Sequence, residues 1–197
     1  MATRMGRTGI TIDLGGTQSP QRGPPRMLPQ TIPTLHSERL ILRAFTQADF
    51  EPMARFYADP VSAFYGGPCG RDDAWRKFAA FLGHWALRGY GPWAMEEKAS
   101  VALVGLSGLW YPEGWLAPEI TWALVPGQHG EGFATEGALR ALRSAYEDFG
   151  WTTAISVISV HNSASEAVAL RMGAQQESLT EYRHGPAKVY RHLSPAA

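Results

Sequence analysis

The sequence feature that most constrains the fold is a run that passes from a strand-like segment through a glycine-spaced loop into a helix. Residues 119–126, Glu-Ile-Thr-Trp-Ala-Leu-Val-Pro, favour a strand, and residues 128–132, Gln-His-Gly-Glu-Gly, follow as a loop. Residues 133–149 then carry recurring apolar side chains at Leu139, Leu142, Tyr146 and Phe149. Because that spacing of three and four residues repeats with the helical period, it predicts a helix with one apolar face.

The glycines of this loop make it a candidate binding site for phosphate groups. The first turn of a helix leaves its backbone N–H groups without partners, and the helix dipole adds partial positive charge at that end. Gly130 and Gly132 carry no Cβ, so a ligand can approach those donors closely. Such a loop suits phosphate or pyrophosphate. A glycine-capped surface loop before an ordinary core helix is the alternative.

Two common phosphate-binding patterns do not fit the loop. The chain contains no Gly-x-x-x-x-Gly-Lys-Ser/Thr run, which excludes a P-loop. The dinucleotide fingerprint Gly-x-Gly-x-x-Gly/Ala requires Gly or Ala at position 135, but Thr135 stands there and Ala134 comes one residue early. A different phosphate ligand is therefore expected.

Composition limits the partners that this chain can have. It has 197 residues, 45% of them apolar, with 18 Lys plus Arg balanced by 18 Asp plus Glu. A net charge of zero gives no indication of nucleic acid or an anionic membrane as partner. Cys69 is the single cysteine, which excludes an intrachain disulfide and favours a reducing cytoplasm. We find no secretory signal, no apolar run long enough to span a bilayer and no metal-ligand spacing of Cys, His and carboxylates.

The remaining sequence divides into an extension and one domain. Residues 1–30 are rich in Gly, Pro, Gln and Thr without apolar periodicity, so we predict a disordered extension there and a single domain over 31–197. Besides the helix after the glycine loop, two helices are predicted. The first carries Phe50, Met53 and Phe56 on one face, and the second, at 72–87, carries the apolar stripe Trp75, Phe78, Leu82 and Trp85.

Strands are predicted at 38–43, 92–95, 101–110, 118–125 and 151–160, followed by a closing hairpin within 175–192. We expect the strand at 151–160 to be buried and parallel to the strand before it.

Three motifs together resemble the GNAT superfamily of acyl-CoA-dependent N-acyltransferases. Residues 129–134, from His129 to Ala134, are similar to its coenzyme A pyrophosphate loop Arg/Gln-x-x-Gly-x-Gly/Ala, with His129 replacing Arg or Gln. Residues 37–49 look like the opening of the branch that includes the ribosomal-protein N-terminal acetyltransferases. Residues 162–174 resemble the second signature, which Asn162, Ser165, Arg171 and Gly173 match while Ala174 replaces the usual Phe.

The resemblance implies an α/β GNAT fold. Its central sheet is mixed but mostly antiparallel, with six to seven strands that splay apart between the fourth and fifth, and about four helices flank it. Acetyl-CoA would be the co-substrate, with no metal. The residues implied to bind it are Leu124, Val125, His129, Gly130, Glu131, Gly132, Phe133, Ala134, Thr135, Asn162 and Arg171. Backbone groups within 122–125 would hold the pantetheine arm, and one N–H would stabilise the oxyanion.

The implied reaction is acetyl transfer to a primary amine. Glu119, which opens the central strand, is our first choice of base, acting directly or through water; a surface strand-end Glu is the alternative. Related enzymes often protonate the thiolate with a Tyr seven residues after the Asn, but this chain has Ala169 there. Ser165 carries that role in the branch resembled. Asn162 would bind the arm or simply cap a helix, and Glu136 is expected to be structural.

The acceptor and the class of protein stay open. The amine could be a protein N-terminus or a small amine, and the aromatic residues of 50–93 would suit an aromatic-walled pocket or plain core packing. The missing Tyr and the altered His129 also permit a non-catalytic acyl-CoA-binding or regulatory module. Relatives are often dimers, so a homodimer is compatible with the resemblance, and no nucleic acid or membrane partner is expected.

Overall fold

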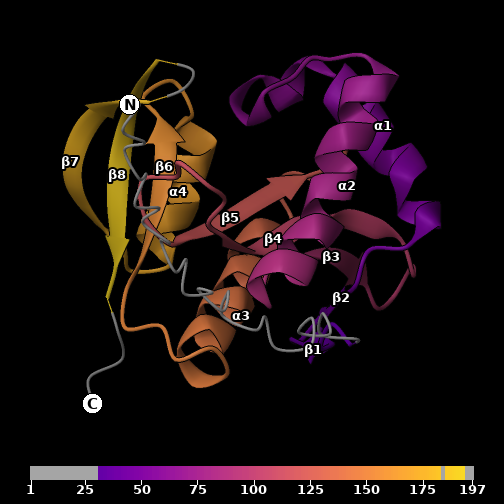
Figure 1. Cartoon of the computed structure of the whole chain (residues 1–197), viewed down its shortest axis with the longest axis horizontal. Coiled ribbons are helices and arrows are strands. Elements are labelled where there is room, and N and C mark those ends of the chain that lie inside the picture. Colours follow the sequence, from indigo (N-terminus) through magenta and orange to yellow (C-terminus); the bar gives the residue numbers. More distant parts are fainter. Residues whose placement is uncertain (1–30, 183–184, 194–197) are drawn as a thin grey trace, which may run out of the picture.

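The computed structural model describes residues 31–182 and 185–193, so the extension predicted for 1–30 lies outside the described residues. One mixed sheet of eight strands has the order β1-β2-β3-β4-β5-β6-β8-β7 (Figure 1). The strands are β1 Leu35–His36, β2 Leu40–Arg43, β3 Pro92–Glu97, β4 Leu103–Trp110, β5 Glu119–Leu124, β6 Ala154–Ser159, β7 Gln175–Glu181 and β8 Pro186–His192. The helices are α1 Phe50–Ala58, α2 Arg71–Arg88, α3 Phe133–Glu147 and α4 Ser163–Arg171, with 3₁₀ turns η1 Gln47–Asp49 and η2 Pro60–Tyr65.

The sheet is antiparallel except at one place. β5 and β6 run parallel, as predicted for the strand in 151–160, and α3 forms the connection between them. The predicted mixed α/β architecture is confirmed, with eight strands in place of six or seven. The added strand is β1, a two-residue pairing with β2 that is too short to leave a periodic pattern in the sequence.

Helices cover both faces of the sheet. Because side chains alternate along a strand, Trp93 and Met95 of β3 enter the apolar cluster that contains the buried face of α3, while Ala94 enters the cluster that contains α1 and the middle of α2. These two clusters form the hydrophobic core on either face of the sheet in the described part of the chain. No helix in the described residues is long and apolar enough to cross a membrane.

α3 lies very close to the sheet, and its buried face includes small residues that the prediction omitted. Leu142 is buried and Tyr146 and Phe149 are partly buried against the core, as predicted, but Leu139 is 43% exposed. Gly137, Ala138, Ala141 and Ala145 make up the rest of the buried face, and a Cβ on Gly137 would lie 2.2 Å from Sδ of Met95, so a larger residue there would require Met95 or the helix to move. Small residues allow close packing, but the sequence pattern gives weight to large apolar residues, so it included Leu139 and omitted the glycine and the alanines.

α2 shows the same kind of error. Phe78 and Trp85 of the predicted stripe are buried, whereas Trp75 and Leu82 are 44% and 38% exposed. Phe81, which the stripe omitted, is buried in their place. α1 buries Phe50, Met53 and Phe56 as predicted.

The sheet opens between β5 and β6, as the family resemblance implied. The only β5–β6 pair recorded in the described residues is Glu119 with Ile155, at the start of both strands. Beyond it the strands diverge (Figure 1), and a small cavity of about 40 Å³ lies between residues 119–122 and 156–159. This opening separates β1–β5 from β6–β8 and provides an edge where a ligand can enter the sheet.

Candidate active site

The loop that leads into α3 offers a set of free backbone donors. Gly130 and Gly132 have φ angles of 93° and 83°, a left-handed conformation that glycine adopts without strain, and Gly132 is the N-cap of α3. In the described residues, none of the backbone N–H groups of 129–135 finds an acceptor; the first N–H that does is that of Glu136, to Gly132 O at 3.1 Å. Residues 129–132 are exposed, so these donors can reach a ligand.

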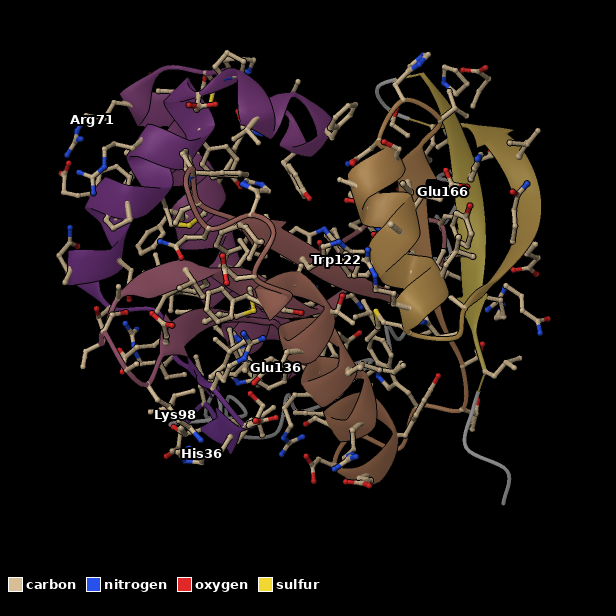
Figure 2. The ribbon with its side chains drawn as sticks, turned by 180° about the vertical axis from the view of Figure 1, so that it is seen from behind. His36, Arg71, Lys98, Trp122, Glu136 and Glu166 are labelled. Atoms are coloured by element: carbon tan, nitrogen blue, oxygen red, sulfur yellow. The ribbon has the colours of Figure 1, made fainter. Side chains whose placement is uncertain are left out.

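The loop is held in place by Arg39 and Glu136. The Arg39 guanidinium donates to Glu131 O at 2.9 Å, lies 4.7 Å from the ring centroid of Phe133 and pairs with Glu136 at 2.8 Å. Glu136 also accepts from Ser37 Oγ and from the Arg39 backbone N–H, both at 2.7 Å, and Figure 2 shows it on α3 beside β2. Burial raises the pKa of Glu136, but these donors outweigh it and hold that pKa below its ordinary value.

Glu136 is therefore structural, as expected. The positioning role of Arg39 was missed, because nothing in a sequence shows that residues this far apart meet. Phe133 and Ala134 are buried under the loop, while Thr135 is half-buried.

The backbone of β5 presents alternate groups to the opening. Val125 donates its N–H to Val104 O at 3.0 Å, which directs that N–H toward the β4 side, and its carbonyl accepts from Gln128 N–H at 3.2 Å within the turn that follows β5. Strand alternation then directs the N–H groups of Trp122 and Leu124 toward β6. Trp122 lies between α3 and α4 in Figure 2. Residues 122–125 were predicted to bind the pantetheine arm through their backbone. In the structure, the N–H groups that can do so are those of Trp122 and Leu124.

α4 begins at the far side of the opening. The Asn162 side chain accepts from the Ser165 backbone N–H at 3.1 Å, which makes Asn162 the N-cap of the helix. The cap uses only Oδ1 of Asn162, so the amide NH₂ of the same side chain takes no part in it. Both Asn162 and Ser165 line the cavity between β5 and β6. The cap and a ligand contact are therefore compatible.

Glu119 is a buried carboxyl at the floor of the opening. It is 6% exposed and accepts hydrogen bonds from Trp115 Nε1 and from Val157 N–H, the latter at 3.3 Å. Burial, only partly offset by these donors, raises the pKa of Glu119 to about 7. A carboxyl with that pKa gains and loses a proton near neutral pH, which is what a general base requires. The alternative of an exposed strand-end Glu does not hold, since the side chain is buried.

Tyr65 also belongs to the opening, whereas the sequence suggested it only as one aromatic residue of a possible acceptor pocket. It ends η2 and lines the same cavity as Glu119, Asn162 and Ser165. Burial, together with the charge of Glu119, raises the pKa of Tyr65, and the neighbouring Ser165 and Asn162 side chains offset part of that rise. The phenol is therefore neutral at physiological pH.

A larger pocket of about 480 Å³ adjoins the opening on the α1 and α2 side. Aromatic rings dominate its walls, and Glu119 is the single acidic side chain among the described residues that line it. Of the aromatic residues proposed from the sequence, Tyr57 and Tyr65 line it, whereas Trp85 and Trp93 are core residues. The other rings belong to Phe56, Phe64, Phe81, Trp110, Trp115 and Tyr182.

Two further predicted contacts lie on the surface. His129 is exposed in the loop, and Arg171 is exposed at the last residue of α4, without an ion pair to any described residue. Both side chains are free to meet a charged ligand. Within the described ranges, no three His, Cys, Asp or Glu side chains gather as a metal site requires.

Comparisons with known proteins agree with this geometry. The model of the acetyltransferase (GNAT) domain family matches residues 39–175. The "Uncharacterized N-acetyltransferase YoaA" of Bacillus subtilis (strain 168) is 26% identical over 151 residues, 75% of this chain and 85% of that protein. The crystal structure of an acetyltransferase from Agrobacterium tumefaciens str. C58 is 32% identical, covers 83% of this chain and 96% of its own, and superposes with a TM-score of 0.77.

Two more distant structures share the fold. The spermidine N-acetyltransferase from Vibrio cholerae in complex with CoA and spermine has a TM-score of 0.66 at 19% identity, covering 79% of this chain and 96% of its own. The ribosomal-protein-S5-alanine acetyltransferase from Vibrio fischeri has a TM-score of 0.64 at 10% identity, covering 83% and 97%.

Proposed function

The chain belongs to the acetyltransferase (GNAT) family, and we propose that it transfers an acetyl group from acetyl-CoA to a primary amine by direct attack on the thioester. The observation that carries the proposal is the opened sheet, with free loop amides at one end and a buried carboxyl at the other. The same arrangement would serve the whole reaction, because the coenzyme and the amine can enter from opposite faces of the sheet.

The coenzyme would be held mainly by backbone groups. The free N–H groups of residues 129–135 suit the diphosphate, with the side chains of His129 and Arg171 as further partners for coenzyme phosphates. The pantetheine arm would add to the exposed edge of β5 through Trp122 and Leu124, and the Asn162 amide would contact it from α4. Whichever of these two N–H groups lies next to the thioester carbonyl would stabilise the developing oxyanion.

Glu119 would act as the base. An ammonium must lose a proton before its nitrogen can attack, and a carboxylate whose pKa lies near 7 accepts that proton without being permanently protonated. Glu119 lines both the opening and the aromatic pocket, so it can meet an amine that enters through the pocket. The proton could pass from the ammonium to Glu119 either directly or through one water molecule.

The pocket favours an amine carried on an apolar or aromatic body. Aromatic rings supply most of its surface, and one carboxyl is available to balance one ammonium. Lys77 lines the same pocket and would repel further positive charge. The Vibrio cholerae neighbour is named for spermidine, a polyamine. For this chain we propose a monoamine or the N-terminus of a peptide with an apolar first residue.

The test is an acetyl-transfer assay with acetyl-CoA and a panel of amines, scored by mass spectrometry of the product. We expect an aromatic monoamine and a peptide N-terminus to give a kcat/KM at least tenfold above that of spermidine. Acetyl-CoA that binds by calorimetry without acetylation of any amine would instead support a non-catalytic acyl-CoA-binding module. Absence of coenzyme binding would overturn the proposal as a whole.

A further inference from the structure

The cavity between β5 and β6 contains an unexplained phenol. Tyr65 reaches it from η2, far from α4 in the sequence, and lines it together with Ser165 and Asn162. Glu119 lines the same cavity. One small space thus holds a buried carboxyl and a half-buried phenol, which are the two kinds of group needed to remove one proton and to deliver another.

The chain positions this phenol firmly. Its ring packs edge-on against Phe56, with centroids 5.5 Å apart, and Gly66 directly after it takes a left-handed φ of 77° that ends the 3₁₀ turn. Ser62 fixes the same turn, because its Oγ donates to Asp59 O at 2.8 Å. Core packing by the ring does not explain why Tyr65 also lines the cavity beside Glu119.

Other hydroxyls of the cavity are less suited to give up a proton. Ser156 Oγ is already engaged, with Ile120 O at 2.7 Å and His192 Nε2 at 2.9 Å. Ser165, our first expectation, carries an aliphatic hydroxyl that is far less acidic than a phenol. A free phenol has a pKa near 10 and a free thiol about 8.5, so proton transfer from a phenol to a thiolate is closely matched. Ser165 and Asn162 would then stabilise the phenolate that forms.

We propose that Tyr65 is the catalytic acid that protonates the coenzyme sulfur as it leaves, an inference that rests on the function proposed above. Glu119 takes one ammonium proton, which passes to solvent, and the neutral nitrogen then attacks the thioester carbon and forms the C–N bond. Collapse of the intermediate breaks the C–S bond, and sulfur receives the phenol proton. The phenolate then regains the second proton lost by nitrogen, through water. One amide, one thiol and one solvent proton result.

The test compares Tyr65→Phe with the control Tyr146→Phe in the full chain. Tyr146 is a half-buried tyrosine whose hydroxyl donates to His192 O at 3.3 Å, outside both cavities. We expect Tyr65→Phe to lower kcat at least 100-fold while the acetyl-CoA Kd from calorimetry and the melting temperature stay at the wild-type values. Tyr146→Phe should keep kcat within threefold of wild type.

Several outcomes would overturn the assignment. If kcat of Tyr65→Phe stays within threefold of wild type, the proton comes from Ser165 or from water. If acetyl-CoA binding weakens while kcat is unchanged, Tyr65 is a binding residue. Wild-type protein that acetylates no amine would refute the proposed function itself, which is a separate result.

A second measurement changes the acidity of the phenol without removing it. Incorporating 3,5-difluorotyrosine at position 65 lowers the phenol pKa, so kcat should decline at a lower alkaline pH than in wild type. Glu119, Tyr57, Lys77 and His161 line the two adjoining cavities with Tyr65 and are left unchanged by this replacement. An identical alkaline profile would contradict acid catalysis by Tyr65.

Discussion

Replacing Glu119 with Gln should stabilise the protein at alkaline pH while it removes activity. In the fold, burial raises the pKa of Glu119 from 4.5 to about 7. Above pH 7 the folded protein therefore contains a buried carboxylate, whereas the unfolded chain exposes it to water. That difference in pKa corresponds to about 3 kcal/mol of lost stability. Gln carries no charge, so Glu119→Gln escapes this cost.

The sign of the pH dependence follows from proton binding. Between pH 4.5 and about 7 the folded state binds more protons at Glu119 than the unfolded state does, so wild-type stability falls as pH rises through that window and is level above it. The free energy of unfolding of Glu119→Gln, measured by urea titration, should therefore gain about 2–3 kcal/mol relative to wild type between pH 5 and pH 8.5. If Gln forms weaker hydrogen bonds to Trp115 or Val157, the loss is the same at both pH values, so it does not affect the change in the stability difference between pH 5 and pH 8.5.

Glu166→Gln is a control whose difference in stability from wild type should not depend on pH over this range. Hydrogen bonds from Lys188 Nζ and the Tyr190 hydroxyl hold the pKa of Glu166 below its ordinary value, so the carboxyl is ionised in both the folded and the unfolded state, and the stability difference between Glu166→Gln and wild type should be the same at pH 5 and pH 8.5. For Glu119→Gln we also expect kcat to fall at least 100-fold and the acid limb of the rate profile near pH 7 to vanish. A stability difference from wild type that is equal at both pH values would refute the raised pKa and, with it, the assignment of the base.

Three other changes test separate parts of the structure. Gly132→Trp should weaken acetyl-CoA binding at least 100-fold in calorimetry, whereas Gly150→Trp, at a φ of 66° with open space around it, should carry a similar backbone strain and keep the affinity. Trp115→Phe removes a donor that lowers the pKa of Glu119, so the acid limb of the kcat/KM profile should move above pH 7. Asp49→Asn breaks a two-bond pair with Arg43 at 2.8 and 2.9 Å and should lower the free energy of unfolding by about 3 kcal/mol in urea, against less than about 0.5 kcal/mol for the exposed Asp72→Asn.

The sequence predicted those parts of the site that depend on local structure. The glycine loop before α3, the parallel strand β6 and the cap at Asn162 each lie within a short stretch whose spacing carries the signal. Glu119 could be placed at the start of a strand, but its burial could not be predicted. That burial depends on Trp115 and on β6, which reaches it only through the fold.

Contacts between distant segments could not be read from the sequence. Tyr65 ends a 3₁₀ turn that has no motif, and its place in one cavity with Asn162 requires α1, η2 and α4 to lie around the same opening. The buried faces of α2 and α3 were misjudged in part for a related reason. Periodicity shows that a helix has an apolar side, but the tight contact of Gly137 with Met95 is decided by how closely the helix approaches the sheet.

The central claim is that coenzyme A enters the opened sheet beside a loop of free amides. A crystal structure of the protein with coenzyme A tests it most directly. We predict diphosphate oxygens within hydrogen-bonding distance of the backbone N–H groups of residues 129–135, and a pantetheine arm along Trp122 and Leu124 with its sulfur next to the Tyr65 hydroxyl. Coenzyme bound elsewhere, or β5 and β6 hydrogen-bonded along their whole length, would contradict it.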